Sequence, residues 1–473
     1  MVARARASLR AMSTAGSAET DDASLVGPEQ VATGVGGPVV AGGGWRSPQP
    51  FPLRTAAAVF LLLLVVAGLF NFVVIQKLPG ISPVDGIVYA DALDRAFDFR
   101  VTVKGDTMGV ATSEYIACRG VHGYDELGLS CGGPYPDTFR GLTTAYVHPP
   151  TYFFLTAGVV KAVQVVAPGV YAFDIARMVG ALWFAVGALL MVWLATLWGA
   201  RPWPAALVMV ALLPTPTGAT TFSFITPDSM SLMVCGGVAL GVTLWWRDRL
   251  PAWSLIFFGL LTAAVKQTYF LAAVAGVLLI AMLWWRQHTR PTRACVSAAV
   301  FVGAGAVIGL VGWDLIKRFI EVVPGDISTG PDPFAVSLDF NGVAQLIFTA
   351  AADFPNEAAG PLLAVPPAAL AMSMGFGLAL AAATGGALLY RSTRSDEFIL
   401  AASGGLTVVF GGLLVSLMYL LSSGIFLPPI VRYIFGGIPL VLLPLMLATS
   451  SRAVRVLLVV LAAVSYIGWM LYQ

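Results

Sequence analysis

The stretch Ser82–Asp98 gathers carboxylates in a chain of which only 11% is charged, directly after the first long apolar run. Written on a helix, it has two opposite faces: an acidic one of Asp91, Asp94 and Asp98, and an apolar one of Tyr89, Leu93, Ala96 and Phe97. That pattern predicts a helix lying in a membrane interface. Asp85 falls outside the acidic face, toward the apolar side, so it is our candidate general base.

Asp85 also has a structural interpretation. Ser82 followed by Pro83 is typical of a helix start, and an acidic residue three positions after the cap can accept hydrogen bonds from free backbone N–H groups. The two roles are compatible, because the N-terminus of a helix also favours an ionised carboxylate.

Four further groups of polar residues lie at predicted membrane boundaries on the same side as Asp85. Each has a structural alternative: Asp228 can begin a helix, Lys266 can extend to lipid headgroups, and Arg432 can anchor to lipid phosphate. Ionisable groups at membrane depth are functional by default, so we expect these groups to converge on one site. They are Tyr146–Tyr152 with His148, Thr226-Pro227-Asp228, Lys266-Gln267-Thr268 and Arg432-Tyr433.

These residue types suit the transfer of a sugar from a lipid phosphate. A carboxylate can take the proton from an acceptor hydroxyl as its oxygen attacks the anomeric carbon. Lysine and arginine can stabilise the charge that grows on the phosphate as the sugar leaves. With Asp85 as the base, the predicted donor- and substrate-binding residues are Asp91, His148, Tyr152, Asp228, Lys266, Arg432 and Tyr433.

The composition is that of an all-α polytopic membrane protein, with 58% hydrophobic residues among 473 and a mean hydropathy of +0.83. Residues 1–50 are polar and precede the first apolar run, which is the wrong order for a cleavable signal peptide, so we expect a disordered cytoplasmic tail before a transmembrane domain of residues 51–473. The predicted membrane spans are 55–75, 174–198, 204–222, 229–246, 252–266, 268–285, 294–313, 361–390, 398–421, 433–449 and 455–471.

Charge decides whether the apolar segment 149–168 is a further span. If it lies on the surface, the segments on the side of the N-terminus carry fifteen basic and seven acidic residues, a net charge of +8, and the other side carries −6. Positive residues favour the cytoplasm, so the N-terminus is expected inside and the C-terminus outside. The exoplasmic side then receives two long loops, about 76–173 and 314–360, of which the first contains the surface helices.

The cysteines and histidines exclude some functions. Cys118 and Cys131 both fall in the first exoplasmic loop, where a structural disulfide is favoured over free thiols. Cys235 and Cys295 fall in apolar spans, and the three histidines are scattered. The sequence has no glycine-rich loop of the nucleotide-binding kind and no feature that indicates a nucleic-acid partner.

In their order along the chain, the polar groups resemble motifs of the membrane-embedded GT-C glycosyltransferases, over about residues 55–450. The likeness is closest to a bacterial branch with Pro-Asp-Glu, His-Pro-Pro-Leu-Tyr-Tyr, Asn-Pro-Asp, Leu-Thr-Lys and Gly-Arg-Tyr elements. Here Gly86 replaces the second acid, Thr226 replaces the asparagine, and Ile430-Val431 precede the arginine. The missing acid leaves open whether Asp85 and Asp91 bind a divalent cation such as Mg²⁺ or Mn²⁺.

The resemblance implies a GT-C-like fold of about 11 transmembrane helices with interface helices in the first exoplasmic loop. It also implies an inverting glycosyltransferase of the bacterial plasma membrane, with an exoplasmic active site and Asp85 as base. The donor would be a polyprenyl-phosphate sugar, and the acceptor a cell-envelope glycan or lipid in cell wall biosynthesis. A transporter or flippase of a lipid-linked sugar and a catalytically silent assembly partner are the alternatives.

Overall fold

The computed structural model describes residues 47–82, 85–121, 131–133, 143, 145–287, 290–320, 365–393, 395–423 and 431–472, which belong to one compact unit. These residues form helices and no strand, with a single isolated bridge between Ile81 and Val121. The expected tail, up to residue 46, and most of the loop 314–360 lie outside the described residues. The α-helices are α1 (Leu53–Lys77), α2 (Gly86–Phe97), α3 (Val110–Arg119), α4 (Thr151–Val166), α5 (Ala172–Leu197), α6 (Pro202–Leu212), α7 (Pro216–Ser223), α8 (Ser231–Trp246), α9 (Leu255–Val265), α10 (Phe270–Gln287), α11 (Thr292–Ile320), α13 (Pro367–Tyr390), α14 (Asp396–Ser423), α15 (Ile438–Ala448) and α16 (Arg452–Leu471).

Eight helices of the described part are long and apolar enough to cross a membrane, or nine if α6 and α7 count as one bent span. That is the character of a polytopic membrane protein. The structure does not confirm the predicted count of eleven, because α9 and α15 have only 11 residues each and are not among these helices. Because a helix rises 1.5 Å per residue, each is about half as long as a hydrocarbon core of about 30 Å.

Contacts between helix ends sort the chain into two sides. On the side where α1 begins, which we call the N-side, the backbone N–H of Gln49 donates to the carbonyl of Thr196 at the end of α5, at 2.9 Å. On the same side, Arg247 donates to the carbonyl of Leu197, and Arg290 pairs with Asp248 at 2.7 Å. On the opposite side, the C-side, Lys77 at the end of α1 donates to the carbonyl of Tyr472. For these helix ends, the two sides agree with the alternation that the sequence predicts.

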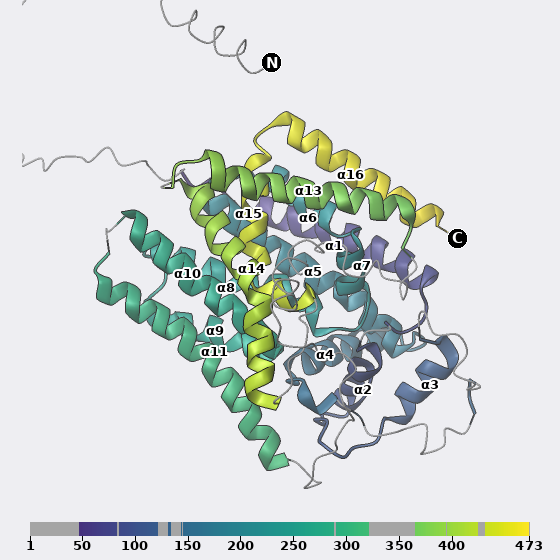
Figure 1. The fold of residues 1–473 in the computed structure, drawn as a ribbon. Coiled ribbons are helices and arrows are strands. Elements are labelled where there is room, and N and C mark those ends of the chain that lie inside the picture. The colour runs from purple at the N-terminus through teal and green to yellow at the C-terminus, as the bar shows by residue number, and fades with distance from the viewer. Residues whose placement is uncertain are drawn as a thin grey trace, which may run out of the picture. The chain divides into compact units, whose positions relative to one another are not determined.

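Helix α4 begins and ends on the C-side, as expected for the segment 149–168. Just before it, the carbonyl of Val147 accepts a hydrogen bond from Trp313 near the end of α11, at 3.2 Å. Just after it, Arg177 in the first turns of α5 contacts the end of α1. Figure 1 shows α4 grouped with α2 and α3, and α2 packs on both of the others.

The predicted span 204–222 is not one straight helix. Helices α6 and α7 meet at an angle of 88° around Pro214 and Pro216. A break in the middle of a membrane span exposes backbone groups that have to be satisfied within the protein. Here the carbonyl of Pro214 accepts hydrogen bonds from Ser465 and from Trp469, both at 3.0 Å. The predicted span therefore consists of two helices, because the two prolines interrupt the helical hydrogen bonds.

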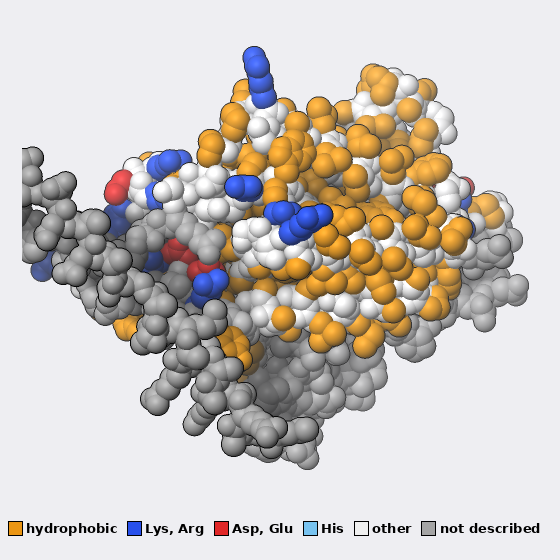
Figure 2. All heavy atoms as spheres, turned by 90° about the horizontal axis from the view of Figure 1, so that it is seen from above, with side chains coloured by type: hydrophobic (Ala, Val, Ile, Leu, Met, Phe, Trp, Pro, Cys, Tyr) orange, Lys and Arg blue, Asp and Glu red, His pale blue; other side chains and the backbone are white. Residues whose placement is uncertain are grey.

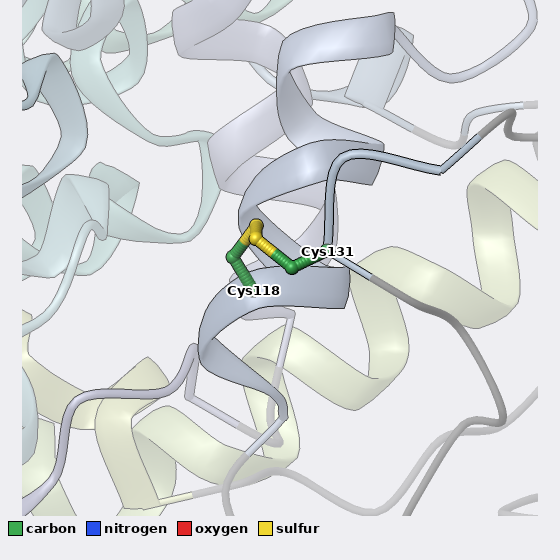
Figure 3. The surroundings of a disulfide bond; sticks show 2 residues. All are labelled: Cys118 and Cys131. Atoms are coloured by element: carbon green, nitrogen blue, oxygen red, sulfur yellow. A yellow bond between two sulfur atoms is a disulfide. The ribbon is translucent and has the colours of Figure 1, made fainter.

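Two further elements differ from the sequence analysis. Helix α11 continues to Ile320, beyond the predicted end of its span at residue 313. The first C-side loop contains α3, which was not foreseen. Cys118 at the end of α3 forms a disulfide with Cys131, with 4.5 Å between the Cα atoms, as expected from the sequence (Figure 3).

Apolar side chains cover much of the outside of the helices. In the span Pro227–Trp246, which contains α8, 89% of the apolar stretch is buried inside the protein, whereas in α13 only 22% is. Helix α13 lies beside α16 at the edge of the helices (Figure 1). Figure 2 shows one face of the molecule covered mainly by hydrophobic side chains. Helix α8 is therefore central, whereas α13 and α16 present surfaces suited to lipid.

Helices α9 and α11 pack closely through glycines. A Cβ atom at Gly259 would overlap the carbonyl of Val302, and one at Gly305 would overlap the carbonyl of Ile256. Small residues allow helix backbones to approach where lipid gives no hydrophobic drive for association. The contact matters for the site below, because α9 ends next to Lys266 and α11 carries Trp313.

We expect the Gly259→Leu variant to unfold at a lower temperature than the natural protein, because overpacking such a contact costs about 1–3 kcal/mol. Thermal unfolding in detergent, followed by circular dichroism, measures the change. Gly303→Leu is the matched control, since a Cβ at Gly303 meets open space. Equal unfolding temperatures for the two variants would contradict the close packing.

Candidate functional site

Asp85 lies immediately before α2, in a conformation that amino acids with side chains rarely adopt. Its φ and ψ angles are 53° and 3°, in the left-handed region, and its side chain makes no capping hydrogen bond. Helix α2 begins at Gly86, so the capping interpretation of Asp85 was wrong. Aspartate is among the residues that adopt this region most readily, and Phe99 and Asp248 also have positive φ, so the backbone angle positions Asp85 without marking it as a site.

Tyr89 connects Asp85 to His148. The hydroxyl of Tyr89 donates to Oδ2 of Asp85 at 3.3 Å, one helical turn along α2. The Tyr89 ring, buried to 1% exposure, meets the imidazole of His148 edge-on, with 5.0 Å between ring centroids. His148 follows the short 3-10 helix η1 (Ala145–Val147), which the hydrogen bond from Trp313 holds against α11. The carboxylate and the imidazole thus flank one aromatic ring.

Asp228 and Lys266 form a buried ion pair. Oδ1 of Asp228 accepts hydrogen bonds from Nζ of Lys266 at 2.6 Å and from the hydroxyl of Tyr269 at 2.7 Å. Asp228 and Lys266 are 2% and 3% exposed. The extension of Lys266 to lipid headgroups, one of its structural alternatives, is therefore wrong. Asp228 also lies at a helix start, as its structural alternative predicted, because its backbone N–H donates to Oγ1 of the N-cap residue Thr226 at 3.2 Å.

Tyr152 joins the two groups of residues. Its hydroxyl accepts a hydrogen bond from the backbone N–H of Thr226 at 3.2 Å, and burial raises the pKa of Tyr152 to about 12, which keeps the phenol protonated. The ring of Phe153 lies between the rings of Tyr152 and Tyr89, at centroid distances of 5.1 and 6.2 Å. One continuous series of contacts therefore runs from Asp85 to Lys266.

At each of the four predicted polar motifs, a short 3-10 helix precedes an α-helix. They are η1 before α4, η2 (Pro227–Met230) before α8, η4 (Gln267–Tyr269) before α10, and η6 (Val431–Gly436) before α15. Helix η6 packs against η4 and the start of α10. Helix η6, which contains Arg432 and Tyr433, thus lies beside η4, which follows Lys266 directly. The side chains of Arg432 and Tyr433 fall outside the described part of the chain.

Asp91 is directed away from this series of contacts, toward α3. Its Oδ1 accepts a hydrogen bond from the N–H of Gly109 at 2.7 Å, and its Oδ2 lies 3.6 Å from Nε of Arg95. Asp94 adjoins the same end of α3, where burial and then the charge of Asp91 raise its pKa. The face of α2 that was expected to be acidic and exposed therefore packs partly inside the protein, and Asp91 is completely buried.

The described residues do not fit the divalent cation that the sequence left open. Within these ranges, no group of three or more His, Cys, Asp and Glu side chains could hold a metal ion. Asp91, one of the two candidate ligands, is occupied by Gly109 and Arg95.

The sequence analysis missed Asn71 and Arg177, which fix the ends of three helices. Arg177, 1% exposed, donates to the carbonyls of Ser223 at 2.8 Å and Pro79 at 3.1 Å. Asn71 donates to the carbonyl of Phe222 at 2.6 Å and accepts from the hydroxyl of Ser223 at 2.8 Å. These contacts hold the segment before Asp85 against α7. A polar residue inside an apolar span was the available signal.

The Asp228–Lys266 pair gives a stability test. We expect Asp228→Ala and Lys266→Met each to destabilise the protein by about 3–5 kcal/mol, because each leaves a buried charge without its partner. The double variant should be less destabilised than the sum of the two single variants. Unfolding of all four proteins in detergent, evaluated as a double-mutant cycle, measures the coupling. Additive effects would show that the two charges do not interact.

Asp94 gives a pH test. Its pKa is raised in the folded protein, so the folded state favours the protonated form, and this contribution to stability is lost as pH rises above the ordinary value of 3.8 through the folded-state pKa. We expect Asp94→Asn to gain stability relative to the natural protein at pH 7 and to gain less at pH 4. Unfolding temperatures at both pH values measure the effect. Glu114→Gln is the control, since Glu114 is exposed and does not act on the pKa of Asp94, and an equal response of both variants would contradict the assignment.

The candidate site thus consists of residues on the C-side: a carboxylate, an imidazole near it and a buried ion pair, joined by aromatic side chains. No protein-family model, curated protein or solved structure matches the chain.

Proposed function

We propose that the protein is an inverting glycosyltransferase that moves a sugar from a polyprenyl-phosphate donor to a cell-envelope glycan or lipid acceptor. The proposal places the C-side outside the bacterial plasma membrane, since the N-side turns carry the excess of basic residues. One observation supports it: the carboxylate of Asp85 lies beside Tyr89 and His148, in a series of contacts that ends at Lys266.

Asp85 is the base of the proposed reaction. Its carboxylate takes the proton of an acceptor hydroxyl while the hydroxyl oxygen attacks the anomeric carbon of the donor sugar. The bond between that carbon and the phosphate oxygen breaks, and its electron pair leaves with the polyprenyl phosphate. Attack opposite the leaving group inverts the anomeric configuration. Tyr89 orients Asp85 through its hydroxyl, and His148 offers a second proton-carrying group on the other side of the same ring.

The phosphate is assigned to the neighbourhood of η4 and η6. Lys266 shares its charge with Asp228, so the pair adds little net charge by itself. In this proposal the ion pair holds η4 in place, and Arg432 of η6 supplies the net positive charge that stabilises the leaving phosphate. Tyr152 and Tyr433 are assigned to donor binding, and Asp91 is assigned a positioning role through α3. No step is routed through a metal ion.

We expect Asp85→Asn to lower sugar transfer by about 10²–10⁴-fold, because the amide cannot accept the proton of the acceptor. Membranes containing the variant, supplied with a polyprenyl-phosphate sugar and an acceptor glycan, give the rate. The matched control is Asp98→Asn, which changes an exposed carboxylate at the other end of α2 and should leave the rate unchanged. Undiminished transfer by Asp85→Asn would remove the assigned base.

A flippase of a lipid-linked sugar is the second candidate, favoured by the break between α6 and α7, since broken helices form substrate sites in transporters. In this protein, Ser465 and Trp469 donate hydrogen bonds to the carbonyl of Pro214 at the break, which favours a structural role for the break over a substrate site. Sealed liposomes distinguish the two functions. A flippase moves a labelled lipid-linked sugar between leaflets without acceptor, whereas the proposed enzyme forms product only when acceptor is present.

A further inference from the structure

A cavity of about 400 Å³ opens on the N-side between α13, α14 and α15, far along the spans from the candidate active site. Ala383 and Gly386 of α13 and Leu447 of α15 form an apolar wall. Arg391, Glu397 and Ser450 form a polar rim at the helix ends. The volume falls within the range of about 300–1,000 Å³ that is typical of ligand pockets.

The space arises because α13 packs tightly along only part of its length. Toward the C-side it contacts α16 closely, since a Cβ at Gly375 would lie 2.8 Å from Leu461 and one at Gly468 would lie 3.0 Å from Ala368. Toward the N-side, a Cβ at Gly386, which lines the cavity, would meet nothing within 4 Å. We call the cavity beside this end of α13 the wedge.

The rim of the wedge carries more positive than negative charge. Arg391 is exposed at the end of α13. The guanidinium of Arg455 donates to the carbonyls of Thr449 at 3.0 Å and Ser450 at 3.1 Å, which places a second positive charge beside the rim. Glu397 is the one carboxylate among the described lining residues. Tyr390, 87% exposed, stands at the same boundary, where aromatic residues commonly meet headgroups.

We propose that this wedge binds one anionic glycerophospholipid of the N-side leaflet. An acyl chain occupies the space between α13 and α15, and the headgroup phosphate lies at Arg391 and the Ser450 rim. The apolar wall favours a lipid over a soluble anion, since a soluble phosphate would leave it unfilled. The basic rim favours an anionic over a zwitterionic headgroup. This inference does not depend on the proposed glycosyltransferase activity.

Native mass spectrometry of the full chain tests the proposal, with phosphatidylglycerol and phosphatidylcholine of identical acyl chains added in detergent. We expect one phosphatidylglycerol molecule to bind in preference to phosphatidylcholine. Gly386→Trp fills the wedge and should weaken phosphatidylglycerol binding by more than roughly tenfold, because each buried methylene contributes several-fold to the affinity. The matched control is Gly385→Trp, which adds the same side chain at a position that does not line the cavity.

The headgroup is tested with Arg391→Gln, which should remove the preference for phosphatidylglycerol. Arg249→Gln, at another N-side turn, should keep it. Circular dichroism and gel filtration confirm that each variant is folded before binding is compared. Equal binding by Gly386→Trp and Gly385→Trp, equal binding of the two lipids, or displacement of phosphatidylglycerol by soluble glycerol phosphate would each overturn the proposal.

Discussion

The arrangement depends on charged side chains that are buried at the C-side ends of apolar helices. Lys266 and Arg177 are almost inaccessible to solvent, and a charge in such a place is tolerated only if the protein supplies its partners. Asp228 and Tyr269 do so for Lys266, and three backbone carbonyls between α1 and α7 do so for Arg177. These requirements fix the ends of five spans relative to one another, and with them the loop that carries Asp85.

The site that results is built from helix beginnings. Short 3-10 turns at the starts of α4, α8, α10 and α15, together with the start of α2, bring the polar residues to the C-side. Turns of this kind leave backbone groups accessible and allow side chains to project along the helix axis. A membrane-embedded enzyme that acts on a lipid phosphate needs such a surface at the headgroup level. The contacts from Asp85 to Lys266 are consistent with that task.

Much of this was accessible from the sequence because hydropathy and charge follow directly from the bilayer as a solvent. The helical, membrane-spanning character of the chain and the pairing of Cys118 with Cys131 follow from such patterns, whereas the membrane position of 149–168 and the shared side of the polar motifs stay predictions. The partners of individual side chains could not be predicted from these patterns. Asp91 was expected at the active site but is bound to the start of α3, and the break at Pro214 and the contacts of Arg177 depend on distant helices.

The central claim is that the segments of Asp85 and Arg432 lie on the same side of the membrane, opposite the basic turns. Labelling of single cysteines in sealed cells with a membrane-impermeant maleimide tests it most directly. The natural background is low, because Cys118 and Cys131 form a disulfide and Cys235 and Cys295 are buried. We expect Asp85→Cys and Arg432→Cys to react from outside and Arg249→Cys to react only after the cells are opened. Reaction of positions 85 and 432 from opposite sides would contradict the account.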